Sequence, residues 1–345
     1  MNTHPSHITI NGCRHTVAEL LALRTDATHE AWQRANWNFL AEWYDDKSYI
    51  EVRTSGSTGV PKLIRLDKDF VAASAQRTLD FFQLRAGDRV LHCLSADYIA
   101  GKLMLLRGLI GELDVHLVSP SSSFDFVPQE DYAFAALVVN QMQKLMCFAP
   151  NIPVAQILLG GSAIPTALEQ RLSGISSRCY SSYAMTETAT HIALRKLNHE
   201  PSDDYYHCLS GIEVEQLPNQ CLQINMPGLS APLATNDAVE LLDAQTFRVL
   251  GRTDNCIISG GKKFFPEEIE QRLSLVVEQP FYISSRPHEV LGEELILILE
   301  ANSDVRLRQE IQEHCARLLH KHAIPRDIVF VDALPRTENG KLLRR

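Results

Sequence analysis

The pattern of hydrophobic and polar residues distinguishes three regions of the chain, and the first of them is the middle region. Between residues 89 and 195, short apolar runs alternate with longer mixed segments. The pattern predicts strands at 89–95, 113–119, 134–140 and 154–161 and helices at 99–110 and 164–172. Strands that alternate with helices are typical of a layered α/β sheet.

Two further patterns follow toward the C-terminus. Short alternating strands between 212 and 252 indicate a small β subdomain. Residues 266–276 begin with proline and two glutamates, which predicts a helix because acids suit the positive end of a helix dipole. The pattern also predicts an amphipathic helix at 307–322 and strands at 293–301 and 327–334. This part is therefore expected to be an α+β unit.

Length and composition allow two domains. The chain has 345 residues, of which 45% are apolar, so it can bury a large core. We expect an N-terminal α/β domain at 1–253, which includes the β subdomain at about 212–252. We expect a smaller C-terminal α+β domain at 254–345.

Charge and cysteine content limit the classes of partner. The net charge of −9 argues against nucleic acid and anionic membranes as main partners. The most apolar stretch, 98–111, is interrupted by Lys102 and Arg107 and is too short to span a bilayer, so no membrane insertion is expected. The chain begins without the apolar core of a signal peptide, and its eight cysteines form no C-x-x-C pair. We expect a cytoplasmic protein with reduced thiols.

The segment 54–62, TSGSTGVPK, combines glycine, serine and threonine with a cation at its end. Glycine lets backbone amides approach an anion, hydroxyls add donors, and Lys62 supplies a positive charge. The alternating stretches 49–53 and 62–66 predict a strand on each side, which favours a phosphate-binding loop over a flexible linker. The usual nucleotide P-loop is excluded, because proline precedes the lysine and leucine follows it.

Two further stretches combine carboxylates with turn residues. In 181–189, SSYAMTETA, a strand is expected to run into a helix near Thr186 and Glu187. A carboxylate beside hydroxyls there suits Mg²⁺ with substrate phosphates, and the alternative is that Thr186 only caps the helix. Asp237 in TNDAVELLD stands at the start of a predicted strand, where the alternative is ordinary turn chemistry.

Two more stretches lie near the expected domain boundary and the end of the chain. The alternative to a functional role for GRTDNCIISGGKKFFPEEIE, at 251–270, is a simple linker. In LPRTENGKLLRR, Lys341 follows Asn-Gly, and the alternative is a solvated lysine beside a hairpin turn. Each alternative is reasonable alone, but all of these stretches occur in one order along one chain.

That order resembles the adenylate-forming family of acyl- and aryl-CoA synthetases. The resembling motifs are TSGSTGVPK, LLGGSAIP, SYAMTET, TND, GRTDNCIISGGKKFFPEEIE and PRTENGK, which run from residue 54 to residue 341. Within the family, ILLGGSAIP, SYAMTETATHI, IISGGKKFFPEEIE and LPRTENGKLLRR look most like the o-succinylbenzoate–CoA ligases of menaquinone biosynthesis. The resemblance implies a large N-terminal domain and a small, mobile C-terminal domain.

The resemblance also implies a two-step reaction. A carboxylic acid and ATP, with Mg²⁺, give an acyl-adenylate and pyrophosphate, and CoA as co-substrate then displaces AMP. The residues implied to bind ATP or AMP are Thr54, Ser55, Gly56, Ser57, Thr58, Gly59, Lys62, Gly161, Ser162, Tyr183, Asp237 and Arg252. The implied catalytic residues are Lys341, Thr186 and Glu187, with Glu187 also as the metal ligand. Asp254 is implied as the hinge, and Gly260 and Gly261 as the path of CoA.

The chain departs from the family pattern in several places. Only 53 residues precede the phosphate loop, so the N-terminal segment is expected to be shortened, and a homodimer is one way to complete the acid pocket. Asn236 and Ala184 stand where the family usually has glycine. Tyr98 stands where many relatives have a histidine that gates the acid. Lys102 is expected either to face a spectator carboxylate of the acid or to point to solvent.

Other functions remain open at this stage. One alternative is another aryl- or acyl-CoA synthetase, and a second is an adenylating enzyme that loads a carrier protein. A non-catalytic regulator that binds nucleotides is disfavoured, because such a protein need not keep Lys62, Glu187 and Lys341 together.

Overall fold

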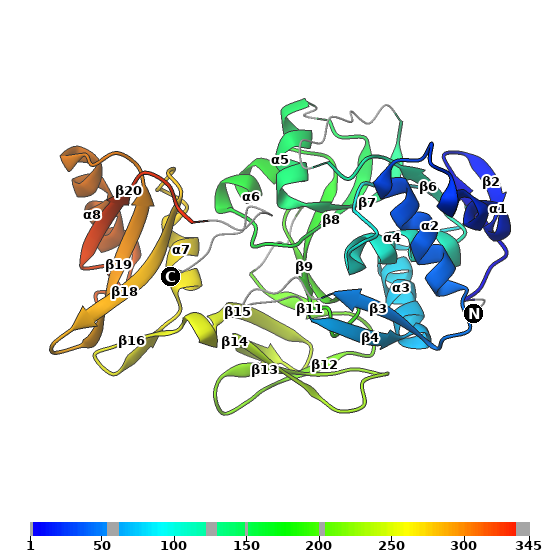
Figure 1. Ribbon diagram of the computed structural model, residues 1–345. Coiled ribbons are helices and arrows are strands. Elements are labelled where there is room, and N and C mark those ends of the chain that lie inside the picture. The colour runs from blue at the N-terminus through cyan, green and yellow to red at the C-terminus, as the bar shows by residue number, and fades with distance from the viewer. Residues whose placement is uncertain (1–2, 54–61, 122–129, 149–150, 200–203, 336–345) are drawn as a thin grey trace. The chain divides into compact units, whose positions relative to one another are not determined.

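The computed structural model describes residues 3–53, 62–121, 130–148, 151–199 and 204–335 (Figure 1). The chain divides into two compact units. Unit 1 comprises residues 1–164, 171–212 and 226–230, and unit 2 comprises residues 165–170, 213–225 and 231–345. This division reflects packing, whereas the boundary expected after residue 253 concerns a rotation between domains, so that boundary stays a prediction.

The main sheet of unit 1 has the strand order β11-β10-β9-β8-β7-β5-β6-β1-β2. The bounds are β1 His7–Ile10, β2 Cys13–Thr16, β5 Arg89–His92, β6 Asp114–Leu117, β7 Tyr132–Val138, β8 Val154–Gly160, β9 Arg178–Ala184, β10 His191–Lys196 and β11 Tyr206–Cys208. Strands β5 to β9 pair in parallel, and β10 runs antiparallel to β9. A separate hairpin consists of β3 Tyr49–Arg53 and β4 Leu63–Asp67.

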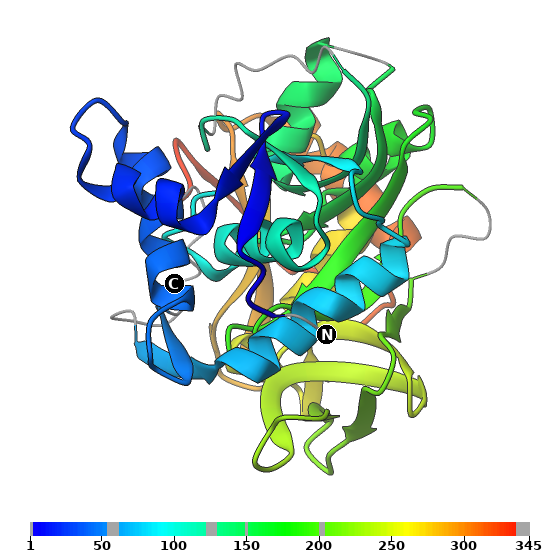
Figure 2. The ribbon, with the colours of Figure 1, turned by 90° about the vertical axis from the view of Figure 1, so that its right-hand side faces the viewer.

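Helices cover this sheet. In unit 1 they are α1 Val17–Ala22, η1 Leu23–Thr25, α2 Ala31–Trp43, α3 Lys68–Phe82, α4 Ile99–Ile110 and α5 Val139–Phe148. Helix α6 Thr166–Leu172 belongs mostly to unit 2. In Figure 2 the cyan helix α3 lies in front of the green strands, and its Phe82 carbonyl accepts a hydrogen bond of 2.8 Å from Gln156 of β8. None of the described helices has the length and apolar character needed to cross a membrane.

Helix α4 lies deepest in unit 1 and is buried from Gly101 to Leu109. Glycine allows this depth at two points. A Cβ on Gly108 would lie 2.1 Å from a Val115 methyl group of β6, and a Cβ on Gly101 would lie 2.1 Å from the Ser95 carbonyl oxygen. The helix therefore packs closely against β6 and against the segment at Ser95, and both of its basic side chains are largely buried.

Unit 2 contains two groups of strands. The first, antiparallel group is β12 Glu213–Gln216, β13 Cys221–Asn225, β14 Leu233–Asp243 and β15 Thr246–Arg252. The second follows the short helix η2 Thr253–Asn255 and comprises β16 Ile257–Ser259, β17 Lys262–Phe264, β18 Phe281–His288, β19 Gly292–Glu300 and β20 Asp327–Val331. Helices α7 Pro266–Leu273 and α8 Val305–Leu318 share an apolar core with this second sheet.

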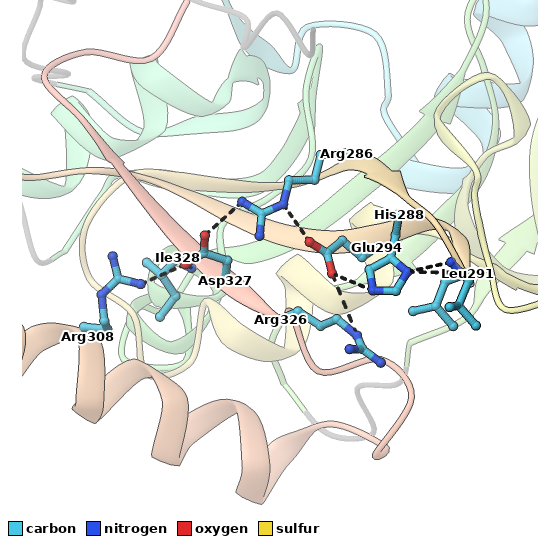
Figure 3. Close-up of polar contacts among 9 residues, drawn as sticks. Arg286, His288, Leu291, Glu294, Arg308, Arg326, Asp327 and Ile328 are labelled. Atoms are coloured by element: carbon cyan, nitrogen blue, oxygen red, sulfur yellow. Dashed lines mark hydrogen bonds and ion pairs between the residues drawn. The ribbon is translucent and has the colours of Figure 1, made fainter.

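Ion pairs join the strands of the second sheet to α8 (Figure 3). Arg286 of β18 donates to Glu294 of β19 at 2.6 Å and to Asp327 of β20 at 3.0 Å. Asp327 also accepts from Arg308 of α8 at 2.9 Å. Because these arginines are 46% and 37% exposed, we assign the network to local support of the sheet.

Most of the predicted elements are confirmed, and the differences fall where one pattern runs into the next. The run predicted as a strand at 134–140 ends at Val138, and helix α5 begins at Val139. The helix expected beyond Thr186 is absent, because β9 returns directly as the antiparallel strand β10. Asp237 lies inside β14, which begins at Leu233, and not at a strand start.

Candidate active site

The structure places the predicted site residues in three groups. Thr54, Ser55, Gly56, Ser57, Thr58, Gly59 and Lys341 lie outside the described residues, so their roles stay predictions. Lys62 belongs to unit 1 and is exposed, directly before β4. Tyr98, Lys102, Gly161, Ser162, Tyr183, Thr186 and Glu187 belong to unit 1. Asp237, Arg252, Asp254, Gly260 and Gly261 belong to unit 2.

The nucleotide-binding residues expected in unit 1 gather at one edge of its sheet. Strands β8 and β9 pair in parallel, so their carboxyl ends lie together. Gly161 and Ser162 directly follow β8, and Tyr183 is near the end of β9. The backbone of Gly161 has a φ of +86°, which favours glycine at this strand exit. Ligands of α/β sheets bind outside the carboxyl ends of strands, so this edge is the candidate site.

The turn between β9 and β10 carries Thr186 and Glu187. It is organised by Thr188, whose buried hydroxyl lies 3.0 Å from the Met185 carbonyl oxygen and 2.8 Å from that of Thr190. The same hydroxyl accepts from the Met185 amide at 3.2 Å. Sequence reasoning missed Thr188, although threonine at every second position of TETAT signalled a turn stabilised by hydroxyls.

Glu187 is the candidate metal ligand on this turn. It is partly exposed and makes no hydrogen bond or ion pair with the described residues. The described residues contain no group of three or more acidic, histidine or cysteine side chains suited to a metal ion. Mg²⁺ commonly binds one or two carboxylates together with substrate phosphates. The role of Glu187 as its ligand stays a prediction.

Lys102 of α4 is buried, with 8% of its surface exposed, so the expectation that it points to solvent is wrong. Its ammonium donates to the Glu42 carboxylate of α2 at 2.6 Å and to the Glu51 carbonyl of β3 at 3.0 Å. The Glu42 carboxylate also accepts from the Glu51 amide at 2.5 Å. Lys102 and Glu42 together bind both backbone groups of one β3 residue, so they tie three elements together. A role of Lys102 toward the substrate stays a prediction, and its charge is already paired.

Arg107 of the same helix is in the opposite situation. It is 2% exposed, and its only hydrogen bond to the described residues runs from Nη2 to the Thr190 hydroxyl at 3.3 Å. Its Nε has no partner, and no described carboxylate lies within ion-pair distance. Burial lowers the pKa of the guanidinium to about 9, so it is still charged at neutral pH. Sequence reasoning saw this arginine only as a break in an apolar run.

Two buried histidines lie near Arg107. Burial and then the charge of Arg107 lower the pKa of His92 to about 4 and that of His191 well below its usual range. Both imidazoles are therefore neutral at pH 7. The group thus carries one positive charge without a described counter-ion, and Thr190 joins it to the turn that holds Glu187. A buried cation of this kind is suited to bind an anion.

In unit 2, Asp237 and Arg252 face each other across β14 and β15. The Arg252 guanidinium lies 3.3 Å from the Asp237 carboxylate and 2.7 Å from that of Asp254. The hydrogen bond from Arg252, followed by that from Asn236, holds the pKa of Asp254 below its usual value. Asn236, which stands where the family usually has glycine, donates to Asp254 at 3.3 Å. The candidate ribose ligand and the candidate hinge residue therefore share one arginine.

Gly260 and Gly261 form the turn between β16 and β17. Their φ values are +56° and +76°, a conformation that side chains with a Cβ disfavour. The turn belongs to a hairpin, so the interpretation of 251–270 as a simple linker is wrong. A Cβ on Gly261 would meet nothing within 4 Å inside the described structure. The backbone explains both glycines, and their role in a CoA path stays a prediction.

Comparison with known proteins identifies the family of the chain. The family model for the AMP-binding enzyme matches residues 25–223, and that for the AMP-binding enzyme C-terminal domain matches residues 281–341. A 2-succinylbenzoate–CoA ligase from Salmonella typhimurium is 26% identical over 309 residues, which cover 83% of this chain and 66% of that ligase. The chain thus spans slightly less than two thirds of the length of this relative.

Solved structures show the same fold. One is the crystal structure of an acyl-CoA synthetase (AMP-forming)/AMP-acid ligase II-like protein from Dyadobacter fermentans, which matches with a TM-score of 0.61 and 29% sequence identity. The matched region covers 91% of this chain and 93% of the Dyadobacter chain. The o-succinylbenzoate CoA synthetase from Bacillus subtilis, in complex with its acyl-adenylate intermediate, has a TM-score of 0.70 and 22% identity over 85% of this chain and 67% of its own. The predicted adenylate-forming α/β fold is confirmed. Because the first family model matches more than half of its residues, the chain belongs to the AMP-binding enzyme family.

Proposed function

We propose that the protein is an ATP-dependent acid–CoA ligase and that its acid is o-succinylbenzoate, as in menaquinone biosynthesis. The observation that carries the choice of acid is the buried guanidinium of Arg107, which has no described carboxylate partner. The relatives named 2-succinylbenzoate–CoA ligase support the same assignment.

Acids differ in the number of carboxylates that they can present to Arg107. Burying an unpaired charge is costly, and a ligand that supplies the opposite charge recovers part of this cost. A fatty acid or benzoate carries only the carboxylate that reacts. o-Succinylbenzoate carries an aromatic carboxylate in addition to the succinyl carboxylate that is activated. We therefore assign the aromatic carboxylate to Arg107, in place of the Lys102 first expected in this role.

The first chemical step makes the carboxyl group reactive. A carboxylate is a poor electrophile, because its leaving group would be oxide. Attack of its oxygen on the α-phosphate of ATP forms an acyl-adenylate and releases pyrophosphate. Catalysis of this kind depends on positioning and on charge neutralisation. We assign the α-phosphate to Thr186 and Lys341, and the ribose hydroxyls to Asp237 with Arg252.

Glu187 would hold Mg²⁺ together with phosphate oxygens, and the ion would supply neutralising charge. The Glu187 carboxylate is suited to this task because no described residue forms a hydrogen bond or an ion pair with it. In the second step, the CoA thiol attacks the acyl carbon and displaces AMP. We assign the approach of the thiol to the turn at Gly260 and Gly261, and the rotation between the two steps to Asp254.

A comparison of acids tests the proposed function. The enzyme is incubated with ATP, Mg²⁺ and one of four acids: o-succinylbenzoate, 3-benzoylpropanoate, benzoate or a medium-chain fatty acid. Hydroxylamine traps the acyl-adenylate, and a parallel reaction with CoA measures the thioester. The proposal predicts the highest kcat/KM with o-succinylbenzoate and a thioester only when CoA is present. A preference for benzoate or the fatty acid would overturn the choice of acid, and the absence of any hydroxamate would overturn the activity.

A further inference from the structure

The orientation of Arg107 depends on a single described contact. Its side chain extends from α4 into the interior and makes one hydrogen bond, to the Thr190 hydroxyl at 3.3 Å. A flexible cation held by one neutral oxygen is positioned only as well as that oxygen is. The position of the guanidinium therefore depends on the groups that hold the Thr190 hydroxyl.

Thr190 belongs to a chain of hydrogen bonds that runs through His191. The Thr190 hydroxyl lies 3.3 Å from Nδ1 of His191, and Nε2 of the same ring lies 3.3 Å from the Thr78 hydroxyl of α3. The Thr78 hydroxyl donates to the Ser74 carbonyl, also at 3.3 Å. Arg107, Thr190, His191 and Thr78 thus form one continuous path from α4 to α3.

The direction of each bond follows from counting protons. Thr78 has one hydroxyl proton and gives it to the Ser74 carbonyl, so it accepts from Nε2 of His191. The imidazole is neutral, because burial and the nearby guanidinium lower its pKa. Its Nδ1 is then an acceptor and takes the Thr190 proton. The Thr190 oxygen is left with lone pairs directed to Arg107, which has only donors.

The reverse tautomer of His191 would break this order. A proton on Nδ1 would force the Thr190 hydroxyl to accept from the ring, and its own proton would turn toward other partners. The Thr190 amide is also held, at 2.8 Å, by the carbonyl of Thr188, the residue that organises the turn of Glu187. The position of Thr190 is therefore shared by the anion-binding group and by the catalytic turn.

We propose that His191 is a positioning residue for recognition of the spectator carboxylate, acting on Arg107 through the hydroxyl of Thr190. The inference rests on the proposed function, because it assigns Arg107 to an acid with a second carboxylate. It goes beyond that function by naming a residue that touches neither the acid nor the nucleotide. It also gives the buried neutral imidazole a role other than filling the core.

Two substitutions of His191 separate this role from simple packing. His191→Asn places an amide oxygen near the Nδ1 position and keeps an acceptor for Thr190. His191→Gln reaches the Nε2 position and keeps a donor for Thr78, but it leaves Thr190 without its acceptor. We expect His191→Gln to lower kcat/KM for o-succinylbenzoate up to roughly tenfold, mainly through KM, as for the loss of one buried hydrogen bond between neutral groups. We expect His191→Asn to stay near the wild-type value.

The second acid makes the test specific. Turnover of 3-benzoylpropanoate, which lacks the aromatic carboxylate, should change little in either variant. Equal losses for both acids, or equal losses in the Asn and Gln variants, would show that His191 only supports the fold and would overturn the inference. If the wild-type enzyme itself does not favour o-succinylbenzoate, the proposed function fails instead.

Thr78→Val provides a second route if His191→Gln does not fold. It removes the acceptor that fixes the proton on Nε2 while it keeps the shape of the side chain. We expect a smaller loss than with His191→Gln, again only for o-succinylbenzoate. An unchanged ratio of kcat/KM between the two acids in folded Thr78→Val enzyme would overturn the proposed path.

Discussion

Lys102 and Arg107 lie on the same helix, are both buried, and interrupt the same apolar sequence, yet their surroundings differ. The Lys102 ammonium has a carboxylate at 2.6 Å and a backbone carbonyl at 3.0 Å. The Arg107 guanidinium has one hydroxyl at 3.3 Å. A buried cation that is fully paired supports the fold, whereas one left unpaired has the capacity to bind an anion. We therefore assign Lys102 to support of the fold and propose that Arg107 binds an anionic group of the substrate.

The strongest test of the Lys102 side of this comparison is Lys102→Met. The variant leaves the Glu42 carboxylate, whose side chain is 23% exposed, without its cation. Breaking a fully buried pair commonly costs about 3–5 kcal/mol, so with this partial exposure we expect the free energy of unfolding in urea to fall by about 2–4 kcal/mol. A loss below about 1 kcal/mol would mean that the pair contributes no more than a surface ion pair.

A double variant tests whether the Lys102 and Glu42 side chains interact. Glu42→Gln keeps an oxygen that accepts from the Glu51 amide but removes the negative charge. Combined with Lys102→Met, it should recover most of the stability lost in the single lysine variant, because no charge is left stranded. Additive losses in the double-mutant cycle would show that the two side chains do not interact.

The next expected effect is a dependence of the free energy of unfolding on pH, which comes from His92 near Arg107. The pKa of His92 is lowered from 6.5 to about 4, so the unfolded chain takes up its proton first as the pH falls. The stability from this group is complete above pH 6.5 and declines toward pH 4. Between pH 7.5 and 4.5 we expect a loss of roughly 2–3 kcal/mol from His92 alone.

The difference between wild type and His92→Gln isolates this contribution from that of the carboxylates. Unfolding in urea is measured for both proteins at the two pH values. The substitution should remove the His92 part of the pH dependence. Parallel curves for the two proteins would contradict the buried, neutral imidazole.

The smallest expected effect on stability is that of Arg107→Met, and its sign is opposite to that of Lys102→Met. Methionine fills similar space without a charge, so the free energy of unfolding should rise by about 1–2 kcal/mol. Urea denaturation of both variants in the same buffer measures the contrast directly. A large destabilisation by Arg107→Met would mean that the guanidinium has a structural partner.

The fold was predictable where the hydrophobic period is regular. Helix α4 was placed at its observed bounds, because its apolar run is long and ends at glycine. Helix α5 was missed, because apolar residues continue from β7 across Val138 and Val139 without a polar break. The turn after Met185 resembled a helix start, because threonine and glutamate serve in both. Local sequence does not distinguish a strand from a helix at Val138 and Val139, or a turn from a helix start after Met185. In the second case, the pairing of β9 with β10 determines that a turn forms.

The site was predictable in its motifs but not in its charges. The order of motifs led to the right family and to candidate residues at one sheet edge. The partner of Lys102 lies 60 positions away, and that of Arg107 lies 83 positions away. Only the folded structure shows which of the two cations is already neutralised. The spectator-carboxylate role was accordingly assigned first to the paired lysine.

The pairing of Arg107 with the substrate is tested by the ratio of kcat/KM for o-succinylbenzoate to that for 3-benzoylpropanoate, measured in wild-type and Arg107→Met enzyme. If Arg107 pairs with the aromatic carboxylate, the variant should lose at least roughly 30-fold with o-succinylbenzoate, equivalent to about 2 kcal/mol. Its turnover of 3-benzoylpropanoate should remain close to that of the wild type. An unchanged ratio, with both acids affected alike, would contradict the assignment of the unpaired arginine to the substrate.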